Sequence, residues 1–211
     1  MATFSVSVAA DADDAKEDEG GINFDASDTV LTMRAGGIVD DISAGLRFQN
    51  VTIPQNANIT SATITIDVTT TTTDDINTVI YCNDVDDAAN FTDEADVLSR
   101  ARTTANTAWA EDAVGSGSQT SPNFASAVAE VIQRAGWASG NDLCVLLISD
   151  GLGGNKACTF YAHEHATGAP VSISIDYLVG FGGGRNKPKP VGSIGANHWP
   201  LSVGREGEAL Y

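Results

Sequence analysis

Two segments of the sequence, residues 11–19 and 83–96, concentrate the carboxylate side chains that hard cations bind. Because calcium takes several oxygen ligands, one interpretation of such a cluster is a calcium-binding loop. The first segment lacks the glycine at the sixth loop position and the glutamate at the twelfth that an EF-hand uses. We therefore expect solvated acidic loops and no cofactor, with calcium as the alternative. The candidate ligands are Asp11, Asp13, Asp14, Asp84, Asp86 and Asp87.

A histidine pair is the other group of metal-ligating residues. His163 and His165 flank Glu164, and two imidazoles at positions i and i+2 of a strand share one face. That geometry can hold a metal ion, but no third ligand is evident in the sequence. We expect structural hydrogen bonding at this position, with metal binding as the alternative.

The sequence carries no catalytic pattern that we can identify. It has no nucleophile elbow, no paired acids at a catalytic spacing and no complete metal triad. The three cysteines, Cys82, Cys144 and Cys158, are too few for a disulfide framework, although a bridge between Cys144 and Cys158 stays open. We predict that the protein is not an enzyme, so a polysaccharide lyase or hydrolase is the least favoured hypothesis.

The elements that must position these residues are mostly β-strands. Residues 46–68 have the pattern of two strands joined by a polar turn, and the second strand alternates apolar and polar residues, as a half-buried strand does. Residues 143–148 are apolar throughout, which is typical of a strand buried on both faces. Further strands are predicted at residues 4–8, 23–33, 78–81 and 171–177.

One helix is predicted, at residues 122–135. Ser121 is a suitable N-cap, Pro122 is favoured at the first helical position, and Gly136 ends the run. Apolar residues recur at spacings of three and four and form one stripe: Phe124, Val128, Val131, Ile132 and Ala135. The fold class that follows is mainly β, an antiparallel and jelly-roll-like β-sandwich with one short helix and an extended C-terminal arm.

Three short motifs, Arg47-Phe48, Ile53-Pro54 and Ile59-Thr60-Ser61-Ala62, are followed by an alternating strand. Together they resemble a DNRLRE-type β-sandwich module, and the resemblance continues through residues 137–148 and 160–177. Such modules are related to carbohydrate-binding modules of large bacterial surface proteins, and similar ones occur in phage particles. The resemblance implies a β-sandwich over residues 1–177, but a fold alone does not assign a function.

A carbohydrate-binding role would draw on Trp109. A tryptophan near threonine and asparagine residues can stack on a sugar ring, so Trp109 is a candidate glycan contact. A single tryptophan in a β-sandwich more often belongs to the core, and the core is the interpretation we favour.

Charge and hydropathy limit the classes of partner. The 211 residues carry a formal net charge of −17, whereas phosphate binding depends on lysine and arginine, so nucleic acid is not expected as a partner. No stretch reaches the roughly 18–20 apolar residues that cross a bilayer, so membrane insertion is not expected. The N-terminus does not resemble a secretory signal. We expect synthesis in the cytoplasm and a final location in a virion or an extracellular assembly.

Residues 178–211 differ in composition from the rest of the chain. They are rich in glycine and proline, which prevents them from building a core of their own. Four basic and two acidic residues give this arm a charge of +2, and subtracting it from the −17 of the whole chain leaves −19 on residues 1–177. The apolar residues expected to anchor the arm are Phe181, Ile194, Trp199, Leu201 and Leu210, with a disordered terminus as the alternative.

A structural protein of an extracellular or viral assembly is the function favoured by these features. It would be a phage virion component, such as a capsid decoration or fibre protein, held by its arm to other copies or to a larger protein lattice such as a capsid. A carbohydrate-binding adhesin module that recognises a surface glycan is the alternative.

Overall fold

The computed structural model describes residues 1–19, 24–36, 40–69, 74–92, 96–149, 151 and 156–179. A short 3-10 helix, η1 (Asp11–Asp13), and one α-helix, α1 (Ala125–Ile132), accompany the strands in these ranges. The strands are β1 (Ala2–Ser7), β2 (Asp14–Asp18), β3 (Val30–Ala35), β4 (Ile42–Phe48), β5 (Asn58–Val68), β6 (Asp74–Cys82), β7 (Thr107–Val114), β8 (Gly117–Thr120), β9 (Leu143–Ser149), β10 (Lys156–Tyr161) and β11 (Ser172–Leu178). The predicted mainly β class is confirmed for the described residues.

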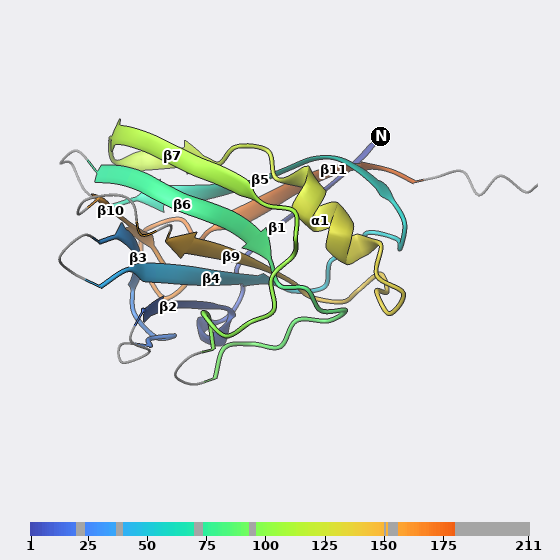
Figure 1. Cartoon of the computed structure of the whole chain (residues 1–211), viewed down its shortest axis with the longest axis horizontal. Helices are drawn as coiled ribbons and strands as arrows, with labels where there is room; N and C mark the ends of the chain where they lie inside the picture. Colours follow the sequence, from blue (N-terminus) through green and yellow to red (C-terminus); the bar gives the residue numbers. More distant parts are fainter. Residues whose placement is uncertain are drawn as a thin grey trace, which may run out of the picture. The chain divides into compact units, whose positions relative to one another are not determined.

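Every strand pair is antiparallel, in the order β1-β11-β5-β10-β3-β4-β9-β6-β7, with β2 beside β4 and β8 beside β5. A single residue pair, Arg34 opposite Ile42, joins β3 to β4. On either side of this contact lie two layers, β1-β11-β5-β10-β3 and β2-β4-β9-β6-β7, and β10 and β3 of the first pack against β6 of the second, which gives a sandwich-like arrangement (Figure 1). The main core contains residues of both layers, including Leu46 of β4 and Ile64 of β5.

Strand β9 is buried on both faces, as its apolar sequence predicted. Leu143, Val145 and Leu147 point into the main core between the layers. Their neighbours Cys144, Leu146 and Ile148 belong to a second apolar cluster together with Ala15 of β2 and residues of segment 83–98. Alternate side chains of β9 thus contribute to two cores on its opposite faces. The second core packs both acidic segments against the layer that contains β9.

The helix is shorter than predicted, because the residues before it pair with β5. The Ser121 and Phe124 N–H groups donate to the carbonyls of Ile64 and Ala62, both at 2.9 Å. The Ser121 hydroxyl accepts the Ile64 N–H at 3.0 Å, so Ser121 is not the N-cap of α1. Residues 121–124 therefore extend β8 along β5, and Pro122 lies outside the helix.

The predicted apolar stripe is confirmed over its helical part. Phe124, Val128, Val131 and Ile132 are buried, and α1 packs against β5 and β6 at one end of the sandwich (Figure 1). Ala135 follows the end of the helix and is exposed, so its assignment to the stripe was wrong. The helix ends because residues 134–136 form turns that lead Trp137 back into the core.

Three other predictions about the elements need correction. Residues 11–19 are not a solvated loop, because they form η1 and β2. The strand predicted at residues 23–33 begins at Val30, since Asp25 and Asp28 hold the preceding residues in side-chain-capped turns. Val51 and Ile53 are buried but lie beyond the end of β4.

Further predictions concern covalent links and the membrane. All three cysteines are buried and none forms a disulfide, so the open question of a Cys144–Cys158 bridge is answered. No helix among the described residues has the length and hydropathy of a membrane span. The predicted arm lies outside the described residues from position 180 onward, so the domain boundary stays a prediction.

Candidate functional site

The middle of the first acidic segment is buried rather than solvated, whereas Asp11 and Glu19 at its ends are exposed. Asp13, Asp14 and Glu17 are each 1% exposed and Asp18 is 3% exposed. A buried carboxylate needs hydrogen bonds or an opposite charge, because the loss of water disfavours its charged form. The hydrogen-bond and ion-pair partners of each carboxylate therefore decide whether it has a structural role or is available to bind a ligand.

Asp13 has its charge balanced within the described structure. Its carboxylate pairs with the guanidinium of Arg47 on β4 and accepts a hydrogen bond from the Gln49 amide at 2.5 Å. Arg47 also pairs with Asp142 and donates from Nε to the Ala88 carbonyl at 2.7 Å. This network joins η1, β4 and the start of β9, which is a structural role.

Glu17 also has a structural role. Its Oε2 accepts the N–H groups of Val97 and Leu98, at 2.8 and 3.0 Å. The side chain of Glu17 thereby holds residues 97 and 98 against β2. Its other oxygen, Oε1, is buried and has no hydrogen-bond partner among the described residues.

A second group forms where η1 meets the turn after β10. Asp11, His163 and Glu164 each bring one ligand atom to this place, and the three atoms lie within 4.8 Å of one another. The His163 Nδ1 and Asp11 Oδ1 atoms are 3.4 Å apart. Asp14 fixes the turn, because its Oδ2 accepts the His163 N–H at 2.9 Å. We call Asp11, Asp14, His163 and Glu164 the η1 cluster.

Several polar atoms of the η1 cluster are buried without a hydrogen-bond partner in the described ranges. They are Asp14 Oδ1, His163 Nδ1 and both carboxylate oxygens of Glu164. No lysine or arginine of those ranges forms an ion pair with Asp11, Asp14 or Glu164. The cluster thus gathers three carboxylates with one imidazole beside them.

Burial and mutual repulsion change the acidity of this cluster. Desolvation raises the pKa of Asp14 to about 7, against the hydrogen bond from His163, and the charges of Glu164, Asp13 and Asp11 raise it further. Desolvation also raises the pKa of Glu164, and nearby Asp11 adds to that increase while His163 opposes it. Both carboxyl groups therefore hold a proton more tightly than usual, chiefly because burial disfavours their charged forms.

The two histidines of the predicted pair do not act together. Residues 163–165 form a turn rather than a strand, so the expected shared face does not exist. His165 Nδ1 accepts the N–H groups of Thr167 and Gly168, at 3.3 and 2.7 Å, and its ring lies against Tyr161. The structural interpretation is confirmed for His165, whereas His163 meets Asp11 from the other end of the chain. No local pattern in the sequence indicates that meeting.

The second acidic segment has a different environment. Asp84 and Asp86 both pair with Arg134, and these side chains are about a third or more exposed. Asp87 accepts the Asp142 N–H at 2.8 Å through its Oδ1. Asp84, Asp86 and Asp87 therefore already have a cation or an amide as partner, and among the described residues of this segment no group of potential metal ligands forms.

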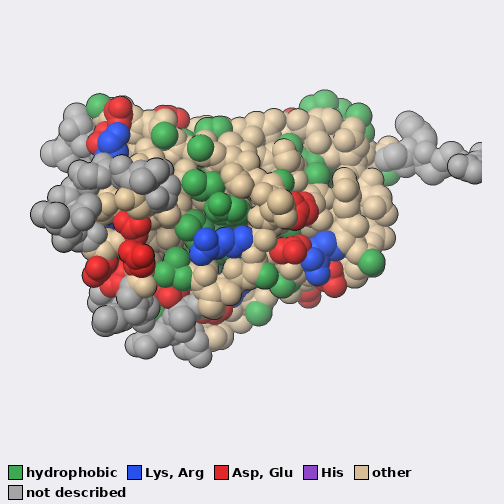
Figure 2. Space-filling model, viewed as in Figure 1, with side chains coloured by type: hydrophobic (Ala, Val, Ile, Leu, Met, Phe, Trp, Pro, Cys, Tyr) green, Lys and Arg blue, Asp and Glu red, His purple; other side chains and the backbone are tan. Residues whose placement is uncertain are grey.

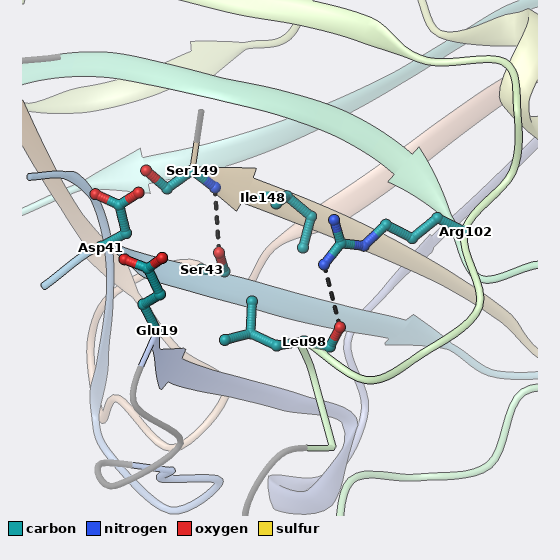
Figure 3. Close-up of a pocket in the computed structure, with 7 residues that line it drawn as sticks. All are labelled: Glu19, Asp41, Ser43, Leu98, Arg102, Ile148 and Ser149. Atoms are coloured by element: carbon teal, nitrogen blue, oxygen red, sulfur yellow. Dashed lines mark hydrogen bonds between the residues drawn. The ribbon is translucent and has the colours of Figure 1, made fainter. Parts of the chain in front are cut away.

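A pocket of about 280 Å³ lies over β4 and β9, beside the second core. Figure 3 shows the carboxylates of Glu19 and Asp41 close together at one end and the guanidinium of Arg102 at the other. Leu98 and Ile148 lie between them, and the Ser149 N–H donates to the Ser43 hydroxyl at 3.1 Å. In Figure 2, hydrophobic atoms in the middle of this face have basic atoms beside them and acidic atoms on both sides.

Trp109 has no exposed ring face. It is fully buried in the main core, and its indole N–H donates to Glu111 at 3.0 Å. The core interpretation is confirmed, and Trp109 as a glycan contact was wrong because a buried ring cannot stack on a sugar. The predicted anchors Phe181, Ile194, Trp199, Leu201 and Leu210 lie outside the described residues.

The comparisons with known proteins do not extend these observations. No protein-family model matches the chain, and no curated protein matches it. The resemblance to DNRLRE-type modules is therefore untested, and the function has to be argued from this chain's own residues.

Proposed function

We propose that this protein is a non-enzymatic structural protein of an extracellular or viral assembly, such as a decoration or fibre protein of a phage capsid. In this proposal residues 178–211 attach it to another copy or to a larger protein lattice. The observation that supports attachment at this end of the domain is the position of the exposed apolar side chains.

The exposed large hydrophobic residues of the described structure gather at one place. They are Met1, 83% exposed, Leu178, 40% exposed, and Val179, 53% exposed. Because β1 and β11 run antiparallel with Ala2 opposite Tyr177, Met1 and Leu178 lie at the same end of this strand pair (Figure 1). Exposed apolar side chains that adjoin one another mark a surface that a partner can cover.

Charge supports contact between copies. The arm carries +2 and residues 1–177 carry −19, as counted from the sequence. Opposite charges attract the arm of one copy to the domain of another, and salt weakens this attraction between exposed groups. Ordering the arm costs roughly 1–2 kcal/mol per residue in backbone entropy, so burial of its apolar residues by a partner is needed to fix it.

Light scattering coupled to size-exclusion chromatography tests this proposal. The full chain should form oligomers as its concentration rises, whereas a chain ending at Tyr177 should keep the same circular dichroism spectrum and remain monomeric. Trp199→Ala should weaken association by at least about 2 kcal/mol, as loss of an anchor residue does. Asn197→Ala, two positions away, is the matched control and should have little effect. If the truncated chain assembles as well as the full one, attachment through the arm is wrong.

A glycan-binding adhesin module is the second candidate, and the pocket between Glu19 and Arg102 favours it. Carboxylate, guanidinium and hydroxyl groups can bond sugar hydroxyls while Leu98 and Ile148 contact an apolar sugar face. A glycan array would test this candidate directly. Binding that is lost in Arg102→Ala and retained in Lys156→Ala would support the pocket, whereas a monomer that binds glycans would replace the assembly proposal.

A further inference from the structure

We propose that Asp11, His163 and Glu164 bind a divalent transition-metal ion, with zinc as the best match. This inference does not rest on the proposed assembly function. It joins residues from the two ends of the described chain that the sequence presents as unrelated groups.

The geometry of the three side chains suits a small cation. Zinc binds carboxylate oxygen at about 2.0–2.2 Å and imidazole nitrogen at about 2.0–2.1 Å, so two ligands of a tetrahedral ion lie roughly 3.4 Å apart. The Asp11 Oδ1 and His163 Nδ1 atoms are 3.4 Å apart, and Glu164 brings its ligand atom within 4.8 Å of both. A small movement of the Glu164 side chain would complete three ligands, and water can take the fourth position because Asp11 is 72% exposed.

The unpartnered buried atoms provide independent support. Asp14 is 1% exposed, and its Oδ1 has no hydrogen-bond partner within the described ranges. Its Oδ2 accepts the backbone N–H of the ligand residue His163, so Asp14 holds the turn that carries two of the ligands. His163 Nδ1 and both Glu164 oxygens also lack a hydrogen-bond partner in those ranges, although Nδ1 lies 3.4 Å from Asp11 Oδ1. Buried polar atoms are almost always satisfied in proteins, and a bound ion is one of the few explanations for several exceptions in one place.

The ligand set distinguishes between metals. Calcium and magnesium select oxygen ligands, whereas imidazole nitrogen suits zinc and other transition metals. One imidazole with two carboxylates therefore favours zinc, with manganese as a weaker binder of the same ligands. Calcium, the ion suggested by acidic residues 11–14 alone, would gain little from His163.

Binding would link η1 to the turn that follows β10. Asp11 lies just after β1, while His163 and Glu164 lie near the end of the described chain, so an ion would connect segments that are distant in sequence. The free energy of binding adds to folding stability when the unfolded chain has no preformed site. We therefore expect zinc to stabilise the fold.

Isothermal titration calorimetry on the full chain, with its purification tag removed and residual metal extracted with EDTA, tests the proposal. Zinc should bind at one site per chain, more tightly than manganese, and calcium should bind weakest. Outer-shell substitutions commonly reduce metal affinity roughly 10- to 100-fold, so His163→Ala and Glu164→Gln should reduce it by at least that much. With zinc about 100-fold above its Kd, the melting temperature should rise by roughly 5–10 °C.

Two matched controls keep the test decisive. His165→Ala changes the other histidine of the same turn, and Asp84→Asn changes the other acidic segment, so both should leave zinc affinity unchanged. Asp11→Asn changes an exposed ligand and should weaken zinc binding without affecting the fold. The proposal is overturned if zinc does not bind, if calcium binds more tightly, or if His165→Ala loses as much affinity as His163→Ala.

Discussion

The two acidic segments have similar compositions and opposite environments. Each is contacted by an arginine from elsewhere in the chain: Arg47 pairs with Asp13 and also with Asp142 before β9, and Arg134 pairs with Asp84 and Asp86. Arg47 is 15% exposed and Asp13 is 1% exposed, whereas Arg134 is 32% exposed. The same chemistry is therefore a buried structural link in one region and a solvated surface pair in the other. Local acidity does not decide the role of a carboxylate, whereas its burial does.

The largest expected difference between the regions concerns these two arginines. Arg47→Ala should lower the free energy of unfolding by about 3–5 kcal/mol, because it leaves the buried Asp13 charge unpaired. Arg134→Ala is the matched control and should change it little, since exposed ion pairs contribute little to stability. Urea denaturation monitored by circular dichroism measures both variants. Equal losses in the two variants would contradict the comparison.

A second difference should appear in the pH dependence of stability. The pKa of Asp14 rises from 3.8 to about 7 on folding. Below pH 4 its carboxyl group is protonated in both the folded and the unfolded protein, and its contribution to the free energy of unfolding is then at its maximum. Between pH 4 and 7 the unfolded state loses the proton first, and stability falls by up to about 4 kcal/mol as pH rises. Asp14→Asn should remove this fall and stabilise the metal-free protein above pH 7.

Denaturation curves at several pH values, recorded with EDTA present, check this prediction. Asp86→Asn applies the same substitution to the second segment and should leave the shape of the pH profile as it is in the wild-type protein. A wild-type profile that rises steadily from pH 4 to pH 7 would rule out the role given to Asp14.

The smallest expected difference concerns two glycines. A Cβ atom at Gly45 on β4 would overlap the buried ring of Phe91, while the nearest atoms to one at Gly136 are those of the Asp86 carboxylate. Gly45→Ala should destabilise the protein by about 1–3 kcal/mol through overpacking. Gly136→Ala should stay within about 0.5 kcal/mol, because an exposed aspartate can move away. Thermal melts of the two variants side by side would detect the difference, and an unchanged Gly45→Ala melt would show that Phe91 is free to move.

The fold class and the core strands could be predicted from the sequence because their signals are local. Alternation of apolar residues located β1, β5 and β11, and the apolar run 143–148 located β9. Strand β2 has no such signal, since Ala15 is its only apolar residue and a buried Glu17 shares its inward face. The start of α1 was misplaced because pairing with β5 overrides the capping preference of Ser121.

The sequence by itself determined the mainly β class, the apolar faces of the strands, the acidic charge of residues 1–177 and the separate composition of the arm. Tertiary structure alone decided which carboxylates are buried, which arginine reaches them, and that Asp11 meets His163 and Glu164. The physical reason is the sequence distance over which each effect acts. Side-chain alternation depends on neighbouring residues, whereas the energy of a buried charge depends on partners that only the folded chain brings near.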